Sequence, residues 1–267
     1  MNILEKIVQQ KRHEVADRKV ERTLTELKER PLYAAPRRSL AYTLALPGST
    51  GIIAEFKRKS PSKGWIAHEL ASPRIAVPAY DQYGAAGISI LTDAPFFGGN
   101  LSDLEESRTM VEAPLLRKDF TIDPYQLHEA RAFGADVILL IAAILEPAQV
   151  RELAAEAKSL GLEVLLELHG DEELGHVCPE VDLVGINNRN LKTFSVDLDR
   201  SVQLAKALPA GKLKVAESGI SSPEDLLFLK AHGFDGFLIG ERFMKEADPG
   251  SAFAAFVGNI KKLSDEA

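Results

Sequence analysis

Short apolar runs recur along most of the chain, separated by polar stretches with helical spacing. The runs are rich in Val, Ile and Leu at consecutive positions, which is typical of parallel strands covered on both faces by helices. Eight such runs are found: Ile52–Phe56, Ile88–Leu91, Leu115–Leu116, Val137–Ile141, Val164–Leu168, Leu183–Ile186, Leu213–Ala216 and Phe237–Ile239. We predict that each run is one strand of a single parallel sheet.

The stretches between the runs carry signals for the start and end of helices. Three begin with a polar residue followed by proline, as at a helix N-terminus: Asp123-Pro124, Glu146-Pro147 and Ser222-Pro223. Four have a glycine shortly before the next run, where a helix ends: Gly84, Gly134, Gly161 and Gly233. Eight strict strand–helix alternations in one domain favour a closed (β/α)8 TIM barrel over an open sheet.

The first 49 residues have a different pattern. From Asn2 to about Arg30 the spacing is helical, with an apolar stripe that includes Ile3 and Ile7, and the proline-containing stretch Pro31–Ser49 is predicted to be a connector. We therefore expect an N-terminal helical extension and connector over residues 1–49 and one catalytic (β/α)8 barrel over residues 50–267. Pro78 falls inside the first barrel helix and is expected to kink or shorten it.

Composition and charge exclude several classes of protein. The 267 residues carry a net charge of −7 without a dense Lys/Arg block, which argues against nucleic acid or an anionic membrane as the main partner. No apolar run is long enough to span a membrane, and the N-terminus has no signal-peptide core, so we expect a cytoplasmic protein. The single cysteine, Cys178, cannot form an intramolecular disulfide, and we expect a partly buried structural thiol. The histidines show no metal-ligand spacing, so no metal is expected.

Charged and polar residues follow most of the predicted strands. In a (β/α)8 barrel the carboxyl ends of the strands form the active site. The residues expected there are Glu55, Lys57, Lys118, Asp119, Glu167, Asn187, Arg189, Glu217 and Ser218. Buried ions must be paired or solvated, so these residues are either a polar plug that only holds the barrel or a catalytic constellation. Their common position on one rim favours catalysis.

Two glycine turns follow the last two predicted strands. They are ESGI, over Glu217–Ile220, and IGERF, over Ile239–Phe243. Backbone N–H groups in these turns, with a short helix starting near Glu241, are suited to bind a phosphate dianion. A pair of tight turns without a ligand is the alternative.

The strand-end motifs together resemble the indole-3-glycerol-phosphate synthase family. The resemblance runs from about residue 1 to residue 262 and rests on IIAEFKRKSPSKG, SILTD, LLRKDF, LLELH, GINNRNL, VAESGI and FLIGERFM. It implies a cofactor-free lyase of tryptophan biosynthesis that acts on a small phosphorylated substrate. The reaction would convert 1-(2-carboxyphenylamino)-1-deoxyribulose 5-phosphate into indole-3-glycerol phosphate, with loss of CO2 and water. We expect a monofunctional monomer.

The resemblance also assigns roles to individual residues. The catalytic residues it implies are Glu55, Lys57, Lys118, Glu167, Asn187 and Ser218, and the phosphate ligands are Ser60, Gly219, Gly240 and Glu241. The contacts to the aromatic ring would be Phe97, Phe120 and Leu191, with Arg189 nearby. Glu241 departs from the family pattern, where a small residue such as serine is frequent. This departure matters little if only the backbone N–H of Glu241 binds.

The chemistry needs two acids and one base, and the resemblance favours Lys118 as the acid for ring closure and Glu167 as the base. Lys57, paired with Glu55, is either the acid for dehydration or a positioning group. We expect His169 to border the site and Asp119 to be a structural partner of a neighbouring lysine or a backbone amide.

Two other functions are alternatives to this one. A phosphoribosylanthranilate isomerase would be expected to use a cysteine and an aspartate as its acid–base pair, and it is disfavoured because Cys178 does not follow a predicted strand. A non-catalytic phosphometabolite-binding protein would lack at least one of Lys57, Lys118 and Glu167.

Overall fold

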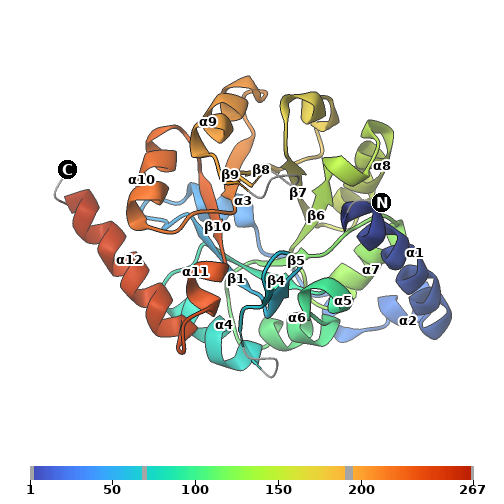
Figure 1. The fold of residues 1–267 in the computed structure, drawn as a ribbon. Coiled ribbons are helices and arrows are strands. Elements are labelled where there is room, and N and C mark those ends of the chain that lie inside the picture. Colours follow the sequence, from blue (N-terminus) through green and yellow to red (C-terminus); the bar gives the residue numbers. More distant parts are fainter. Residues whose placement is uncertain (1–2, 68–70, 190–194, 266–267) are drawn as a thin grey trace.

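The computed structural model describes residues 3–67, 71–189 and 195–265. Within them, eight parallel strands close into a barrel in the order β1-β10-β9-β8-β7-β6-β5-β4 (Figure 1). The strands are β1 (Ile52–Phe56), β4 (Gly87–Leu91), β5 (Leu115–Lys118), β6 (Val137–Ile141), β7 (Glu163–Leu168), β8 (Leu183–Asn187), β9 (Leu213–Glu217) and β10 (Gly236–Ile239). Every predicted run is a strand, so the TIM-barrel prediction is confirmed.

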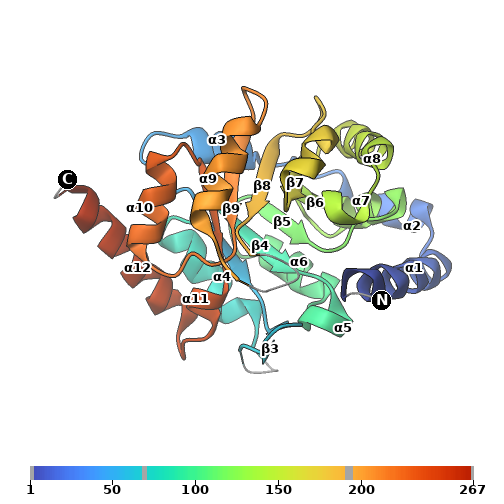
Figure 2. The ribbon, with the colours of Figure 1, turned by 45° about the horizontal axis from the view of Figure 1, so that its top comes forward.

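A ring of helices surrounds the barrel (Figures 1 and 2). The barrel helices are α4 (Pro73–Gln82), α5 (Ala94–Phe97), α6 (Leu101–Arg108), α7 (Pro124–Ala132), α8 (Pro147–Ser159), α9 (Leu198–Ala207), α10 (Pro223–Ala231), α11 (Glu241–Met244) and α12 (Pro249–Asp265). Short 3-10 helices, η2 (Ala142–Ile144) and η3 (Asp171–His176), lie after β6 and β7. The predicted N-caps Asp123 and Ser222 accept hydrogen bonds from the first turns of α7 and α10. Pro78 lies inside α4, which continues to Gln82.

The stretch predicted to be a connector contains structure that seals the barrel. It forms a 3-10 helix, η1 (Pro31–Tyr33), and a helix, α3 (Leu40–Ala45), beneath the amino ends of the strands. Leu40 and Leu44 of α3 join the apolar cluster that fills the barrel interior. A Cβ atom on Gly87, at the start of β4, would lie 2.6 Å from Leu40 Cδ1, so a side chain there would displace α3. The stretch predicted to be a connector therefore also closes the barrel at the amino ends of its strands.

The N-terminal extension is two helices, not one. Helix α1 spans Ile3–Glu21, and α2 spans Leu24–Lys28 after a capping box in which Thr23 and Glu26 hydrogen-bond each other. Both lie beside α7 on the outside of the barrel (Figure 1). Ile7 on α1 is buried in the cluster that fills the barrel interior, so α1 reaches the carboxyl rim of the strands. None of the helices in the described ranges is long and apolar enough to cross a membrane.

Candidate active site

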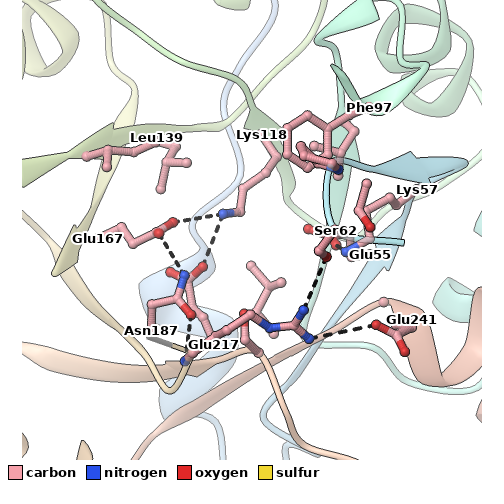
Figure 3. Close-up of a pocket in the computed structure, with 18 of the residues that line it drawn as sticks. Glu55, Lys57, Ser62, Phe97, Lys118, Leu139, Glu167, Asn187, Glu217 and Glu241 are labelled. Atoms are coloured by element: carbon pink, nitrogen blue, oxygen red, sulfur yellow. Dashed lines mark hydrogen bonds and ion pairs between the residues drawn. The ribbon is translucent and has the colours of Figure 1, made fainter. Parts of the chain in front are cut away.

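A pocket opens at the carboxyl ends of the barrel strands (Figure 3). The described residues predicted for the site all line it: Glu55, Lys57, Ser60, Phe97, Lys118, Phe120, Glu167, Asn187, Arg189, Ser218, Gly219, Gly240 and Glu241. Leu191, predicted to contact the aromatic ring, lies outside the described residues. The fold therefore brings these residues to one place, and their individual roles stay predictions.

Lys118 lies at the centre of the charged groups in the pocket (Figure 3). At the end of β5, its Nζ donates a 3.0 Å hydrogen bond to Glu167 Oε2 and lies 3.1 Å from Glu217 Oε2. Burial alone would lower the pKa of Lys118, but the carboxylates of Glu167, Glu217 and Glu55 outweigh it and hold the pKa above its usual value. Lys118 is therefore an ammonium ion.

Glu167 is held by hydrogen-bond donors on both of its oxygens. Asn187 Nδ2, at the end of β8, donates to Oε1 over 2.9 Å, while Lys118 contacts Oε2. Burial acts to raise the pKa of Glu167, but Lys118 and then His169 lower it well below its ordinary value. Glu167 is thus an ionised carboxylate that is able to accept a proton.

Glu217 lies on the predicted rim but has no role predicted from the sequence. Burial raises its pKa to about 7, with the attraction of Lys118 opposing that rise and the repulsion of Glu167 adding to it. Its Oε1 is buried and has no hydrogen-bond partner among the described residues. Two carboxylates that share one ammonium ion cannot both be stabilised fully, and Glu217 is the one that holds a proton near neutral pH. Only its three-dimensional neighbours reveal this property.

A second ion pair forms another wall of the pocket. Lys57 Nζ lies 2.5 Å from Glu55 Oε1, and Ser89 Oγ donates to Glu55 Oε2 over 3.4 Å. Glu55 is on β1 and Lys57 follows that strand, which places both near the last strand, β10. The predicted pairing of Lys57 with Glu55 is confirmed.

The aromatic side of the pocket joins the barrel rim to the N-terminal extension. Phe97, at the end of α5, and Phe120, after β5, have ring centroids 5.9 Å apart. Ile3, Leu4 and Ile7 from α1 line the same pocket. The apolar stripe of α1 was visible in the sequence, but no local signal showed that it faces a ligand pocket.

A buried ion cluster fixes α1 to this rim. Lys11 Nζ on α1 lies 2.8 Å from Asp93 Oδ2 and 2.9 Å from Asp119 Oδ1, and all three side chains are fully buried. Asp93 also accepts a hydrogen bond from the backbone N–H of Phe96, and Asp119 accepts one from that of Phe120. Asp119 thus has both contacts expected of it, one with a lysine and one with a backbone amide, although the lysine comes from the extension; its structural role stays a prediction.

The two glycine turns predicted to bind phosphate lie side by side. The first has two residues with a positive φ, and both turns are packed closely against neighbouring side chains. Among the described residues, Ser218 is the one non-glycine residue with a positive φ, 67°, and Gly219 follows at 75°. A Cβ atom on Gly219 would lie 2.3 Å from Val196 Cγ1, and one on Gly240 would lie 2.7 Å from Glu55 Oε1. Gly240 immediately precedes α11, as predicted. Both turns thus require glycine.

Cations neutralise the Glu241 carboxylate at the pocket edge. Lys63 Nζ lies 2.5 Å from Glu241 Oε1, and Arg189 Nη2 lies 3.8 Å from Oε2 (Figure 3). Burial acts to raise the pKa of Glu241, but Lys63 and Arg189 lower it overall. The acidic side chain that departs from the family pattern is therefore paired, and its charge does not stand alone beside a phosphate.

Of two further residues considered in the sequence, only His169 is part of the pocket. His169, expected only to border it, lines it directly and lies beside Glu167. Cys178 is buried away from the pocket lining, and burial raises the pKa of its thiol.

The described part of the chain contains no candidate metal site, because no three of its His, Cys, Asp or Glu residues are grouped so as to hold a metal ion.

Comparison with known proteins identifies relatives over the whole barrel. A family model described as indole-3-glycerol phosphate synthase matches residues 4–256. A protein of that name from Bacteroides thetaiotaomicron is 49% identical over 260 residues, which cover 97% of this chain and 99% of the relative. One from Magnetococcus marinus is 46% identical over 264 residues, covering 97% and 98%.

The fold is shared with more distant barrels. A mutant tryptophan synthase alpha-subunit from Pyrococcus furiosus superposes with a TM-score of 0.60 at 16% identity, covering 79% of this chain and 97% of that one. At this level of identity the similarity concerns the fold alone.

Proposed function

The chain belongs to the indole-3-glycerol phosphate synthase family, and on that premise we propose that its pocket closes an indole ring on a phosphorylated anthranilate–pentulose conjugate. The protein is a carbon–carbon lyase of tryptophan biosynthesis. It converts 1-(2-carboxyphenylamino)-1-deoxyribulose 5-phosphate into indole-3-glycerol phosphate, CO2 and water.

The pocket offers separate places for the two ends of this substrate. The phosphate would lie against the backbone amides of the Ser218–Gly219 and Gly240–Glu241 turns, within reach of Ser60. The aromatic ring would lie at the opposite side, against Phe97 and Phe120. Between these ends, the ketone carbon and the ring carbon that carries the carboxylate meet close to Lys118.

Ring closure needs an acid at the ketone oxygen. As the ring carbon attacks the carbonyl carbon, negative charge develops on the oxygen, and the Lys118 ammonium group can donate a proton to it. The carboxylate then leaves as CO2, and its bonding electrons restore the aromatic ring. The product of this stage carries a hydroxyl group on the new five-membered ring.

Dehydration needs a second acid and a base. The hydroxyl leaves as water when it is protonated, and Glu167 removes the proton from the neighbouring carbon to complete the indole. Because Glu167 Oε2 is 3.0 Å from Lys118 Nζ, the proton that Glu167 gains can return to Lys118. Lys57, held at 2.5 Å by Glu55, remains the candidate for the second acid or for positioning of the substrate.

The observation that carries this proposal is one partly buried ammonium group, that of Lys118, placed 3.0 Å and 3.1 Å from two carboxyl groups at the mouth of the barrel. The alternative, a polar plug that only holds the barrel, uses the same contacts. The two interpretations predict opposite effects on turnover and on stability.

Substitution of the acid and the base separates the two interpretations. Lys118→Met and Glu167→Gln preserve side-chain length, and each should lower kcat by at least about a hundredfold, because a group that transfers a proton in the transition state contributes roughly 10²–10⁴-fold. Binding of a product analogue should change little. Indole fluorescence measures turnover, and thermal melts measure stability.

Lys158→Met is the matched control, because Lys158 also forms an ion pair, with Asp182 over 2.7 Å, but lies outside the pocket. It should leave kcat unchanged. Near-wild-type turnover in Lys118→Met, together with a large loss of stability, would support the polar plug and leave Lys57 as the candidate acid.

We also propose that the chain is a monomer. Sedimentation equilibrium should then give a mass of 29.2 kDa.

A further inference from the structure

Lys63 lies beside the proposed phosphate site and has no role in the chemistry described above. It belongs to the turn of the hairpin that β2 (Lys59–Ser60) forms with β3 (Gly64–Trp65) after β1. Its backbone N–H donates a 3.4 Å hydrogen bond to the carbonyl oxygen of Ser60, a predicted phosphate ligand. Its side chain reaches across to α11, where Nζ lies 2.5 Å from Glu241 Oε1. Lys63 therefore joins two elements that are both proposed to hold the phosphate.

The Glu241 carboxylate has the wrong charge for this place. The backbone N–H of Glu241 is one of the amides proposed to bind phosphate, and its side chain lines the edge of the same pocket (Figure 3). Burial acts to raise the pKa of Glu241, but Lys63, and then Arg189 and Lys57, lower it overall, so the group is ionised. A phosphate monoester is close to a dianion at neutral pH, and a bare carboxylate beside it would repel it.

Lys63 is the cation that lies closest to Glu241 among the described residues. The guanidinium group of Arg189 is farther away, with Nη2 3.8 Å from Glu241 Oε2, and Lys57 is already paired with Glu55. Lys63 itself is not part of the pocket lining, and 52% of its side chain is exposed. Its effect on a bound phosphate must therefore pass through Glu241, because Lys63 does not face the phosphate directly.

We propose that Lys63 is a positioning residue of the phosphate site that acts through Glu241, an inference that rests on the function proposed above. The carboxylate holds the flexible lysine at the edge of the site, and the ammonium group cancels the negative charge that the phosphate would otherwise meet. The backbone amides of the two turns can then accept a dianion although an acidic side chain lies beside them. Without the carboxylate, the lysine is released into water, where its charge is screened.

A double-mutant cycle on KM tests whether the two residues act as a unit. Lys63→Met leaves Glu241 without its close cation. It should raise KM roughly fivefold to tenfold at low salt, with little change in kcat, because the phosphate is far from the reacting atoms. In the Glu241→Gln background the same substitution should raise KM by no more than about twofold, because the lysine is no longer held at the site. Equal increases in the two backgrounds would overturn the proposal.

Two further readouts belong to charge compensation and not to the shape of the hairpin. Lys63→Arg keeps the charge and should restore KM to near the value of the unsubstituted protein. The ratio of KM in Lys63→Met to KM in the unsubstituted protein should fall towards one in 1 M salt, where the screening length is about 3 Å. A raised KM in Lys63→Arg, or a ratio that does not depend on salt, would assign the effect to the shape of the hairpin and contradict the proposal.

Lys59→Met is the matched control, because it removes the same charge from the same hairpin. Lys59 has no carboxylate partner closer than 4.0 Å in the described part of the chain, lies outside the pocket lining, and donates a 3.1 Å hydrogen bond to the carbonyl oxygen of Pro95. It should leave KM within about twofold. A rise in KM as large as in Lys63→Met would show that any charge lost from the hairpin weakens binding, and the role of the Glu241 pair would be refuted.

Inorganic phosphate measures binding without turnover, so it separates the two proposals. It should raise the Tm of the unsubstituted protein more than that of Lys63→Met, and the difference should shrink in the Glu241→Gln background. If the unsubstituted protein forms indole but Lys63→Met behaves alike in both backgrounds, the pair fails and the proposed function stands. If it forms no indole but protection by phosphate follows the expected order, the proposed function fails and the pair stands.

Discussion

The carboxyl group of Glu217 shows how one buried residue links catalysis to stability. Its folded pKa, about 7, lies above the ordinary value of 4.5, so the folded state binds more protons than the unfolded state between these two values. The stability of the protein should therefore decline as pH rises through this window. The decline is the cost of ionising a carboxyl group that is buried and lies close to Glu167.

Glu217→Gln should remove this pH dependence. Between about pH 5 and pH 8 the unsubstituted protein should lose on the order of 1–3 kcal/mol of unfolding free energy relative to the variant. Urea titrations of both proteins at the two pH values measure the difference. A constant difference between the two proteins at all pH values would show that Glu217 does not titrate in this range.

Gly219 gives a test of the proposed phosphate site. Gly219→Ala forces a side chain onto a residue with φ of 75° and into Val196, so the backbone amides of the turn must move. We expect KM to rise on the order of tenfold or more, with a smaller change in kcat, because a phosphate far from the reacting atoms contributes mainly uniform binding. Steady-state kinetics on the anthranilate–deoxyribulose phosphate give both constants.

Gly211→Ala controls for the backbone strain, because Gly211 has a φ of 82° and lies outside the pocket. Apart from its two chain neighbours, no described residue has an atom within 4 Å of the position that its Cβ would take. It should lower stability without changing KM. An equal rise in KM for both variants would place the phosphate elsewhere.

At the residue scale, the sequence predicted positions better than roles. Glu55, Lys118, Glu167 and Asn187 were located correctly because parallel strands end on one rim, which local patterns reveal. The protonation of Glu217 could not be predicted, since it depends on distances between side chains far apart in the chain. By contrast, His169 is only two residues from Glu167, so its place beside the site was expected from the sequence.

At the scale of elements, α1 is a structural part of the pocket. Its Lys11 pairs with Asp93 and shares Asp119 with Arg117, and removing one member of a buried ion group typically costs about 3–5 kcal/mol. The same carboxylates hold the backbone beside Phe97 and Phe120. Loss of Lys11 should therefore disturb the ring-binding side as well as the fold.

Lys11→Met should lower the unfolding free energy by roughly 3–5 kcal/mol and raise KM. Denaturant titration and kinetics at a temperature where the variant remains folded measure the two effects. Lys19→Met is the control, because Lys19 on α1 pairs with Asp123 in a largely exposed position. A stability loss in Lys11→Met no greater than in Lys19→Met would contradict the importance of the cluster.

Elements with a long apolar pattern were predicted from the sequence, whereas very short strands and a helix that lies among prolines were not. Most positions of the eight barrel strands are buried on both faces, so their sequences show the apolar pattern directly. The hairpin of β2 (Lys59–Ser60) and β3 (Gly64–Trp65) has strands too short for any periodicity. Helix α3 lies among prolines and was interpreted as a connector because its function, sealing the barrel, depends on contacts with distant strands.

At the scale of the molecule, the charge distribution makes a metal unnecessary for the proposed chemistry. Lysine ammonium groups supply the electrophilic assistance at the ketone oxygen that a metal ion gives in other lyases. Activity should therefore survive exhaustive chelation with EDTA. Measurement of indole formation before and after chelation tests this expectation, and loss of activity that one divalent ion restores would contradict it.

The two ends of the described chain lie on opposite sides of the molecule (Figures 1 and 2). Helix α12 ends away from the pocket, whereas Ile3 and Leu4 at the start of α1 form part of the pocket wall. Any affinity tag or fusion partner placed ahead of Ile3 must begin beside the mouth through which substrate enters. A tag attached behind α12 leaves that mouth free. The choice of terminus therefore decides whether a purification tag also obstructs the entry of substrate.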